Sequence, residues 1–120
     1  MAKTQMTLIG TDIEQISRLQ RVIARTPGFV GRVFTETERA YCSQQARPAQ
    51  HYAARFCAKE AVAKALGIPV RWKEIGVVHD AQGAPKVRLS GVMAKKMGQR
   101  AVRLSLAHAG DYAIATALIE

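Results

Sequence analysis

The sequence predicts an α+β domain in which helices from the first half of the chain pack on an antiparallel sheet formed mostly by the second half. Three observations favour this class. The 120 residues are 48% hydrophobic, enough for one domain, residues 1–120, to bury a core without disulfides or a structural metal. Gln50 to Leu66 contains neither proline nor glycine and is rich in alanine, as in a long helix. Beyond it, short β-rich runs alternate with turn-forming residues.

The elements before the long helix follow from apolar patterns and helix boundaries. Met6 to Ile13 has the β-rich content of a strand, and a helix follows from about Ile16 to Arg25. Thr26-Pro27-Gly28 ends that helix. Thr35-Glu-Thr-Glu38 has the form of a capping box, so it should open a short helix that stops before Pro48.

After the long helix ends at Gly67, we expect two hairpins with a short helix between them. The expected elements are strands Ile75–His79 and Lys86–Leu89, a helix Val92–Met97, and strands Val102–His108 and Tyr112–Ile119. Asp80, Gly83 and Pro85 are turn formers between the first two strands, and Gly110-Asp111 joins the last two.

The chain is basic, with 18 Lys+Arg against 9 Asp+Glu and a formal charge of +9. This charge favours an anionic partner, but nucleic acids, acidic proteins, phosphate-bearing cofactors and membrane surfaces all satisfy it. No stretch reaches the ~20 apolar residues of a membrane span, and no secretory signal opens the chain, so we expect a cytoplasmic protein. Cys42 and Cys57 lie among apolar neighbours in helical patterns, which predicts reduced, buried thiols.

Two acidic groups are candidates for chemistry. Asp12 and Glu14 are two residues apart in a predicted strand, so they should share one face. That face suits a hard cation such as Mg²⁺, although a solvated acidic strand end explains the pair equally simply. Glu60 lies on an apolar flank of the long helix and needs a cation, a metal or a raised pKa. Lys64, one turn on, forms either a surface ion pair with Glu60 or, with Arg55, a site for diphosphate.

Several motifs together resemble one family. They are Gly-x-Asp-Ile near the start, Arg-Phe-x-x-Lys-Glu-Ala-x-x-Lys-Ala-Leu-Gly from Arg55 to Gly67, Gly-x-Pro at Gly83–Pro85 and Ser-x-x-His at Ser105–His108. This combination resembles the short, trimeric holo-[acyl-carrier-protein] synthases of the 4′-phosphopantetheinyl transferases, from Ile9 to Glu120. The resemblance implies transfer of 4′-phosphopantetheine from coenzyme A to a serine of apo acyl carrier protein, with release of 3′,5′-ADP.

The resemblance also implies roles for the acidic residues and for Lys64. Mg²⁺ is the expected cofactor, held by Asp12 and Glu60, while Lys64 contacts phosphate. We expect Glu60 to accept the serine proton, directly or through a water, with Asp12 as the alternative base. Glu14 stands where short family members often have a neutral residue, so its part in metal binding is open.

Further residues match the family's contacts to coenzyme A and to the carrier protein. Arg55, Phe56, Gly83, Pro85 and His108 are the expected coenzyme A contacts, and His108 should also lie near the subunit interface of a homotrimer. Arg18 matches the docking arginine. Arg21 and Arg25 follow it at helical spacing, so we extend the role to them, although such a stripe is also typical of a solvated helix face.

One motif departs from the family pattern, and two alternative functions are considered. Gly67-Ile68-Pro69 replaces the usual Gly-Thr-Gly, so cofactor contacts there should differ. A basic RNA-binding module is the main alternative, yet the chain lacks a Gly-x-x-Gly loop and aromatic-rich strands, so we expect no nucleic acid or membrane partner. A catalytically inactive trimer is a third reading. His51 and His79 receive no role, and Trp72 is expected to be a packing residue.

Overall fold

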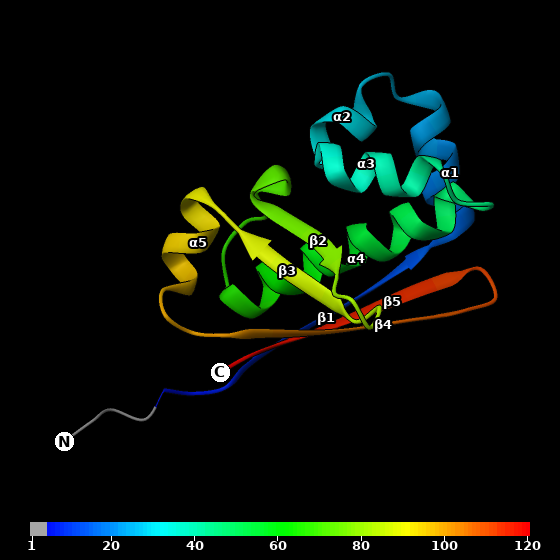
Figure 1. Ribbon diagram of the computed structural model, residues 1–120. Helices are drawn as coiled ribbons and strands as arrows, with labels where there is room; N and C mark the ends of the chain where they lie inside the picture. The colour runs from blue at the N-terminus through cyan, green and yellow to red at the C-terminus, as the bar shows by residue number, and fades with distance from the viewer. Residues whose placement is uncertain (1–4) are drawn as a thin grey trace.

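The computed structural model describes residues 5–120. Its elements are β1 (Leu8–Gln15), α1 (Ile16–Arg25), α2 (Phe29–Val33), α3 (Glu36–Ser43), α4 (Pro48–Leu66), the 3₁₀ turn η1 (Trp72–Glu74), β2 (Ile75–His79), β3 (Pro85–Leu89), α5 (Gly91–Met97), β4 (Val102–Ala109) and β5 (Tyr112–Ile119). The long helix lies across the strands in the middle of the molecule, with α1 to α3 gathered near its start (Figure 1). The predicted α+β class is therefore confirmed.

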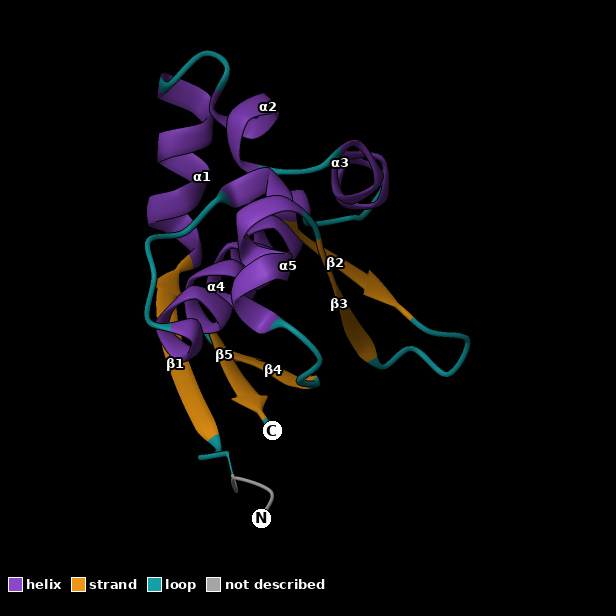
Figure 2. Cartoon of the chain, turned by 90° about the vertical axis from the view of Figure 1, so that its left-hand side faces the viewer, coloured by secondary structure: helices purple, strands orange, loops and turns teal. Residues whose placement is uncertain are grey.

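The strands form two antiparallel sheets rather than one. The larger has the order β1-β5-β4, with Gly10 opposite Ala117 and Leu104 also opposite Ala117. The hairpin β2–β3 stands apart as a second sheet, with Val77 opposite Val87 (Figure 2). Alternation along the strands predicted the hairpins, but it carries no information about which strands of different hairpins pair.

Small residues let α4 lie close against the larger sheet. Ala113, Ala115 and Ala117 alternate along β5 on the buried face. A Cβ placed on Gly10 of β1 would lie 2.1 Å from the carbonyl oxygen of Ala61, so only glycine permits this approach.

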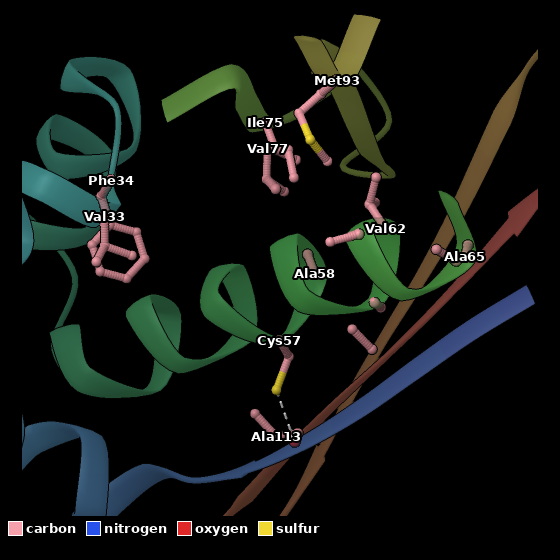
Figure 3. Packing of buried hydrophobic residues seen from close by; sticks show 14 of the residues in the cluster. Val33, Phe34, Cys57, Ala58, Val62, Ala65, Ile75, Val77, Met93 and Ala113 are labelled. Carbon is pink, nitrogen blue, oxygen red and sulfur yellow. Dashed lines mark hydrogen bonds between the residues drawn. The ribbon is translucent and has the colours of Figure 1, made fainter. Parts of the chain in front are cut away.

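The core lies on both sides of α4 (Figure 3). Cys57 points toward the larger sheet, where its thiol donates to the carbonyl oxygen of Ala113 at 3.2 Å. Val62 faces the opposite way, toward Ile75 and Met93. Cys42 and Cys57 are free and buried, as predicted, and burial raises the pKa of both thiols.

The main differences from the predicted helices are α2 and the start of α4. The capping box of α3 is formed, since Thr35 Oγ1 accepts from Glu38 N and Glu38 Oε1 accepts from Thr35 N. The short helix α2 was not predicted, because glycine interrupts its brief apolar pattern. Helix α4 begins at Pro48, two residues earlier than expected, because proline is favoured in a first helical turn.

No helix within residues 5–120 combines the length and the apolar character needed to cross a bilayer.

Candidate active site

The acidic residues of β1 face α4. Asp12 is opposite Ala115 and Glu14 is opposite Ala113, both buried residues of β5, so the two carboxylates share the helix-covered face of the sheet. Their side chains are 12% and 16% exposed. The common face expected from the two-residue spacing is confirmed.

Lys64 connects α4 to this strand. Its Nζ lies 3.0 Å from Asp12 Oδ1 and donates to the carbonyl oxygen of Thr11 at 3.1 Å. Its hydrogen bond to Asp12 raises the pKa of Lys64, so the ammonium is retained. The side chain is 53% exposed, so the charge stays accessible from solvent. The ion-pair partner of Lys64 is therefore Asp12 and not Glu60, the partner considered from the sequence.

The two other carboxylates have raised pKa values. Burial is the main cause for Glu60, with a further increase from nearby Asp12 and an opposing effect of Lys64. Burial and Asp12 raise the pKa of Glu14 to about 7. Glu14 also lies 3.8 Å from Arg18 Nη1. Asp12, Glu14 and Glu60 therefore lie close enough to repel one another.

This arrangement fits a divalent cation. Asp12 Oδ2 is buried and has no hydrogen-bond partner among residues 5–120. A buried anionic oxygen without a partner is costly, and a cation next to it would remove that cost. The described residues contain no group of three His, Cys, Asp or Glu side chains arranged as a metal cage. Asp12 and Glu60 offer two carboxylates, and Mg²⁺ is commonly bound through one or two carboxylates together with waters.

Arg55, nearer the start of α4, is surrounded by a second group of polar and aromatic side chains. It is 2% exposed, and its guanidinium carbon lies 4.3 Å from the centre of the Tyr41 ring. Nη1 donates to the carbonyl oxygen of His51, and Nη2 lies 3.3 Å from His79 Nδ1. Because arginine only donates, His79 Nδ1 must be the acceptor, and the ring is neutral. Arg55 Nε is buried without a partner in the described chain.

A cavity of about 180 Å³ opens beside Arg55. The chain's three histidines, His51, His79 and His108, all line it, together with Tyr41. Burial, followed by Arg55, lowers the pKa of His51 and His79. The sequence motifs predicted roles for Arg55 and His108 but not for Tyr41, His51 and His79. Tyr41, His51 and His79 belong to α3, α4 and β2, so no spacing along the sequence indicates that they lie together.

Gly83, Pro85 and Phe56 are the remaining predicted coenzyme A contacts, and they lie in different parts of the structure. Gly83, at φ +85°, is in the β2–β3 turn, and Pro85 opens β3 opposite His79, which brings this turn to the Arg55 cavity. Phe56 does not line that cavity. Its ring stacks on Trp72 at 4.8 Å between centroids, so the packing role expected for Trp72 is confirmed. A cofactor contact of Phe56 stays a prediction.

Arg18, Arg21 and Arg25 are all exposed on α1. Because α1 follows β1 without an intervening loop, the stripe begins next to the acidic residues.

Comparison with known proteins defines the class of protein to which this fold and site belong. The model of the 4′-phosphopantetheinyl transferase superfamily matches residues 8–117, and the chain belongs to this superfamily. Within it, the chain is similar to holo-[acyl-carrier-protein] synthases. The protein of that name from Anaeromyxobacter dehalogenans is 44% identical over 121 residues, covering 93% of this chain and 94% of the relative. The one from Myxococcus xanthus is 45% identical over 118 residues, covering 93% of each.

Solved structures that resemble this chain also include holo-[acyl-carrier-protein] synthases. The holo-[acyl-carrier-protein] synthase of Neisseria meningitidis superposes with a TM-score of 0.83 at 34% identity, covering 94% of this chain and 97% of that one. An ACPS–CoA complex from Chronobacterium ammoniagenes gives 0.86 at 30% identity, covering 97% and 98%. The resemblance expected from the motifs is confirmed.

Proposed function

We propose that this chain transfers 4′-phosphopantetheine from coenzyme A to a serine of apo acyl carrier protein, giving the holo carrier and 3′,5′-ADP. The observation that carries the proposal is the contact of Lys64 with Asp12 beside Glu60, at the positions that match the family's motifs. The names of the similar proteins, and the coenzyme A complexes among them, support both the reaction and coenzyme A as co-substrate.

The residues supply electrostatics and proton transfer. Mg²⁺, held by Asp12 and Glu60, would offset the negative charge of the diphosphate. Lys64 neutralises phosphate charge from the exposed side of the site. The serine oxygen forms a bond to the β-phosphorus while the bond from that phosphorus to the oxygen of 3′,5′-ADP breaks. Glu60 accepts the serine proton, directly or through a water, with Asp12 as the alternative base.

The other end of coenzyme A lies at the Arg55 cavity. The buried guanidinium, with one unpartnered donor, and His108 at the rim suit an anionic nucleotide. Pro85 pairs with His79, which lines the same cavity, and Gly83 lies in the turn that precedes Pro85. The arginines of α1 attract an acidic carrier protein, so the rate of transfer should fall as salt rises.

We also propose that the chain works as a homotrimer, with sites completed at subunit interfaces. The face of the larger sheet opposite α4 exposes apolar side chains: Ile9 is 67%, Ile13 58% and Ile114 38% exposed. An apolar strip of this kind is typical of a subunit contact. Sedimentation velocity should give a mass of three chains, and Ile13→Lys should dissociate them.

Mass spectrometry of an apo carrier protein incubated with this chain, coenzyme A and Mg²⁺ tests the reaction. We expect a gain of one phosphopantetheine group, lost in Asp12→Ala and Glu60→Ala and retained in Glu36→Ala, which removes an exposed carboxylate on α3. Removal of divalent ions with a chelator should abolish both transfer and coenzyme A binding. An unmodified carrier with folded wild-type protein, across several candidate carriers, would refute the proposal.

A further inference from the structure

Helix α1, which bears the arginine stripe, has no cap of its own. Gln15 is its N-cap residue and makes no side-chain capping hydrogen bond, and the first turn contains no acidic residue. The first amide groups of a helix have no partners within it. Something outside the helix must therefore satisfy them.

Asp111 provides the partners from the turn between β4 and β5. Its carbonyl oxygen accepts from Ile16 N at 2.7 Å. Its carboxylate accepts from Ser17 N at 3.0 Å through Oδ1 and from Ser17 Oγ at 2.5 Å through Oδ2. The two Ser17 contacts join residues 94 positions apart in the chain. In Figure 1 the β4–β5 turn lies on the same side of the molecule as the start of α1.

Packing of Ile16 against the core and the contacts of Asp111 together hold the start of α1. A cavity of about 350 Å³, lined by Ile16, Gln20 and Asp111, separates it from the loop before α4. Leu19 is buried and fastens the middle of the helix to the core. Ile16 and Ile23 pack against the same core, and the contacts of Asp111 additionally fix the first turn of the helix.

We propose that Asp111 is a positioning residue for carrier docking, because it sets the direction of α1, and so of Arg18 and Arg21, relative to the site where phosphopantetheine is transferred. The inference rests on the proposed function. Asp111 lies three residues after His108 in the same β-hairpin. The β4–β5 hairpin thereby carries both His108, at the nucleotide end of the site, and Asp111, which contacts the first turn of the docking helix.

Steady-state kinetics with apo carrier protein and coenzyme A as separately varied substrates tests this role. Asp111→Ala should raise the KM for the carrier about fivefold, the size expected for loss of a cap, while kcat at saturating carrier and the Kd of coenzyme A stay unchanged. Asp111→Asn keeps an acceptor for Ser17 N and should recover most of the loss. Ser17→Ala removes only the hydroxyl contact and should raise the KM about twofold.

Hydrogen exchange provides a readout that does not depend on turnover. In Asp111→Ala, the amides of Ile16 and Ser17 should exchange faster, and those of Leu66 should not. Glu36→Ala is the matched control and should change neither KM nor exchange. Unchanged carrier KM in both Asp111→Ala and Ser17→Ala, with active wild-type protein, would overturn the positioning role alone. Failure of the wild-type chain to modify any carrier would overturn the proposed function together with it.

Discussion

Two lysines of α4 each pair with a carboxylate, yet their surroundings differ. Lys59 Nζ lies 2.8 Å from Glu38 Oε1, and both side chains are 0% exposed. Lys64 Nζ lies 3.0 Å from Asp12 Oδ1, and its side chain is 53% exposed. The pairs have nearly the same length and lie five residues apart, so the pair distance alone does not separate a structural pair from a functional one.

The two pairs differ in how many of the hydrogen-bonding positions of the lysine and the carboxylate have a partner. Lys59 Nζ also donates to the carbonyl oxygens of Trp72 and Ile75, which accounts for all three of its donors. Glu38 additionally accepts from Thr35 N and Val77 N. Around Lys64, by contrast, a donor remains for solvent or substrate, and Asp12 Oδ2 has no partner in the described chain. A saturated pair holds the fold, and an unsaturated pair is available for binding.

Breaking the saturated pair should have the largest effect on stability. Lys59→Met leaves Glu38 buried without its cation, so the free energy of unfolding should fall by about 3–5 kcal/mol. Urea denaturation measures it. Lys95→Met, on the exposed face of α5, is the control and should change the value by less than about 0.5 kcal/mol. A small loss in Lys59→Met would contradict a structural role.

The unsaturated pair should behave in the opposite way. Lys64→Met should lower kcat for carrier modification by about 10²-fold, because a charge directed at the phosphate is lost. Its free energy of unfolding should change by less than about 1 kcal/mol, since the pair is exposed on the lysine side. Equal losses of stability and activity would make Lys64 a second structural lysine.

Gly10→Ala tests whether the close approach of β1 and α4 is needed for the Lys64–Asp12 contact. The added Cβ would meet Ala61 O at 2.1 Å, so the strand must move, at a cost of about 1–3 kcal/mol in unfolding free energy. Activity should fall as well. Gly31→Ala is the control: its Cβ would meet only Arg39 Nη1, at 3.9 Å, and the protein should remain stable.

Arg55 is buried like Lys59, and its hydrogen bond to His79 should give the smallest effect, dependent on pH. His79 accepts from it only when neutral, and burial followed by Arg55 lowers the pKa of His79 from 6.5, against an opposing effect of Asp80. The neutral ring therefore stabilises the fold above pH 6.5, and this contribution is lost as pH falls through the folded-state pKa. His79 is exposed, so the loss should be less than about 1 kcal/mol.

Urea midpoints at pH 7.5 and 5.0 measure this effect as the difference between the wild type and His79→Asn, whose amide oxygen accepts at both values. If both proteins lose the same stability between pH 7.5 and 5.0, His79 is not the source of that loss.

Much of the fold and part of the site follow from local pattern. The two hairpins, the capping box at Thr35 and the shared face of Asp12 and Glu14 depend on neighbours within a few residues. The motif around Glu60 and Lys64 predicted a phosphate contact for Lys64. It did not identify Lys59 as buried, because that depends on Glu38, which arrives from α3.

The amino-acid order by itself determined most of the secondary structure, the basic charge and the residue types available for phosphate chemistry, since hydrogen bonding and periodicity act over short separations. Only the tertiary structure decided which lysine is saturated, which histidine accepts from Arg55 and that Asp111 caps α1. Each of these depends on polar groups distant in the chain, and their partners are chosen by the packing of α4 between two sheets.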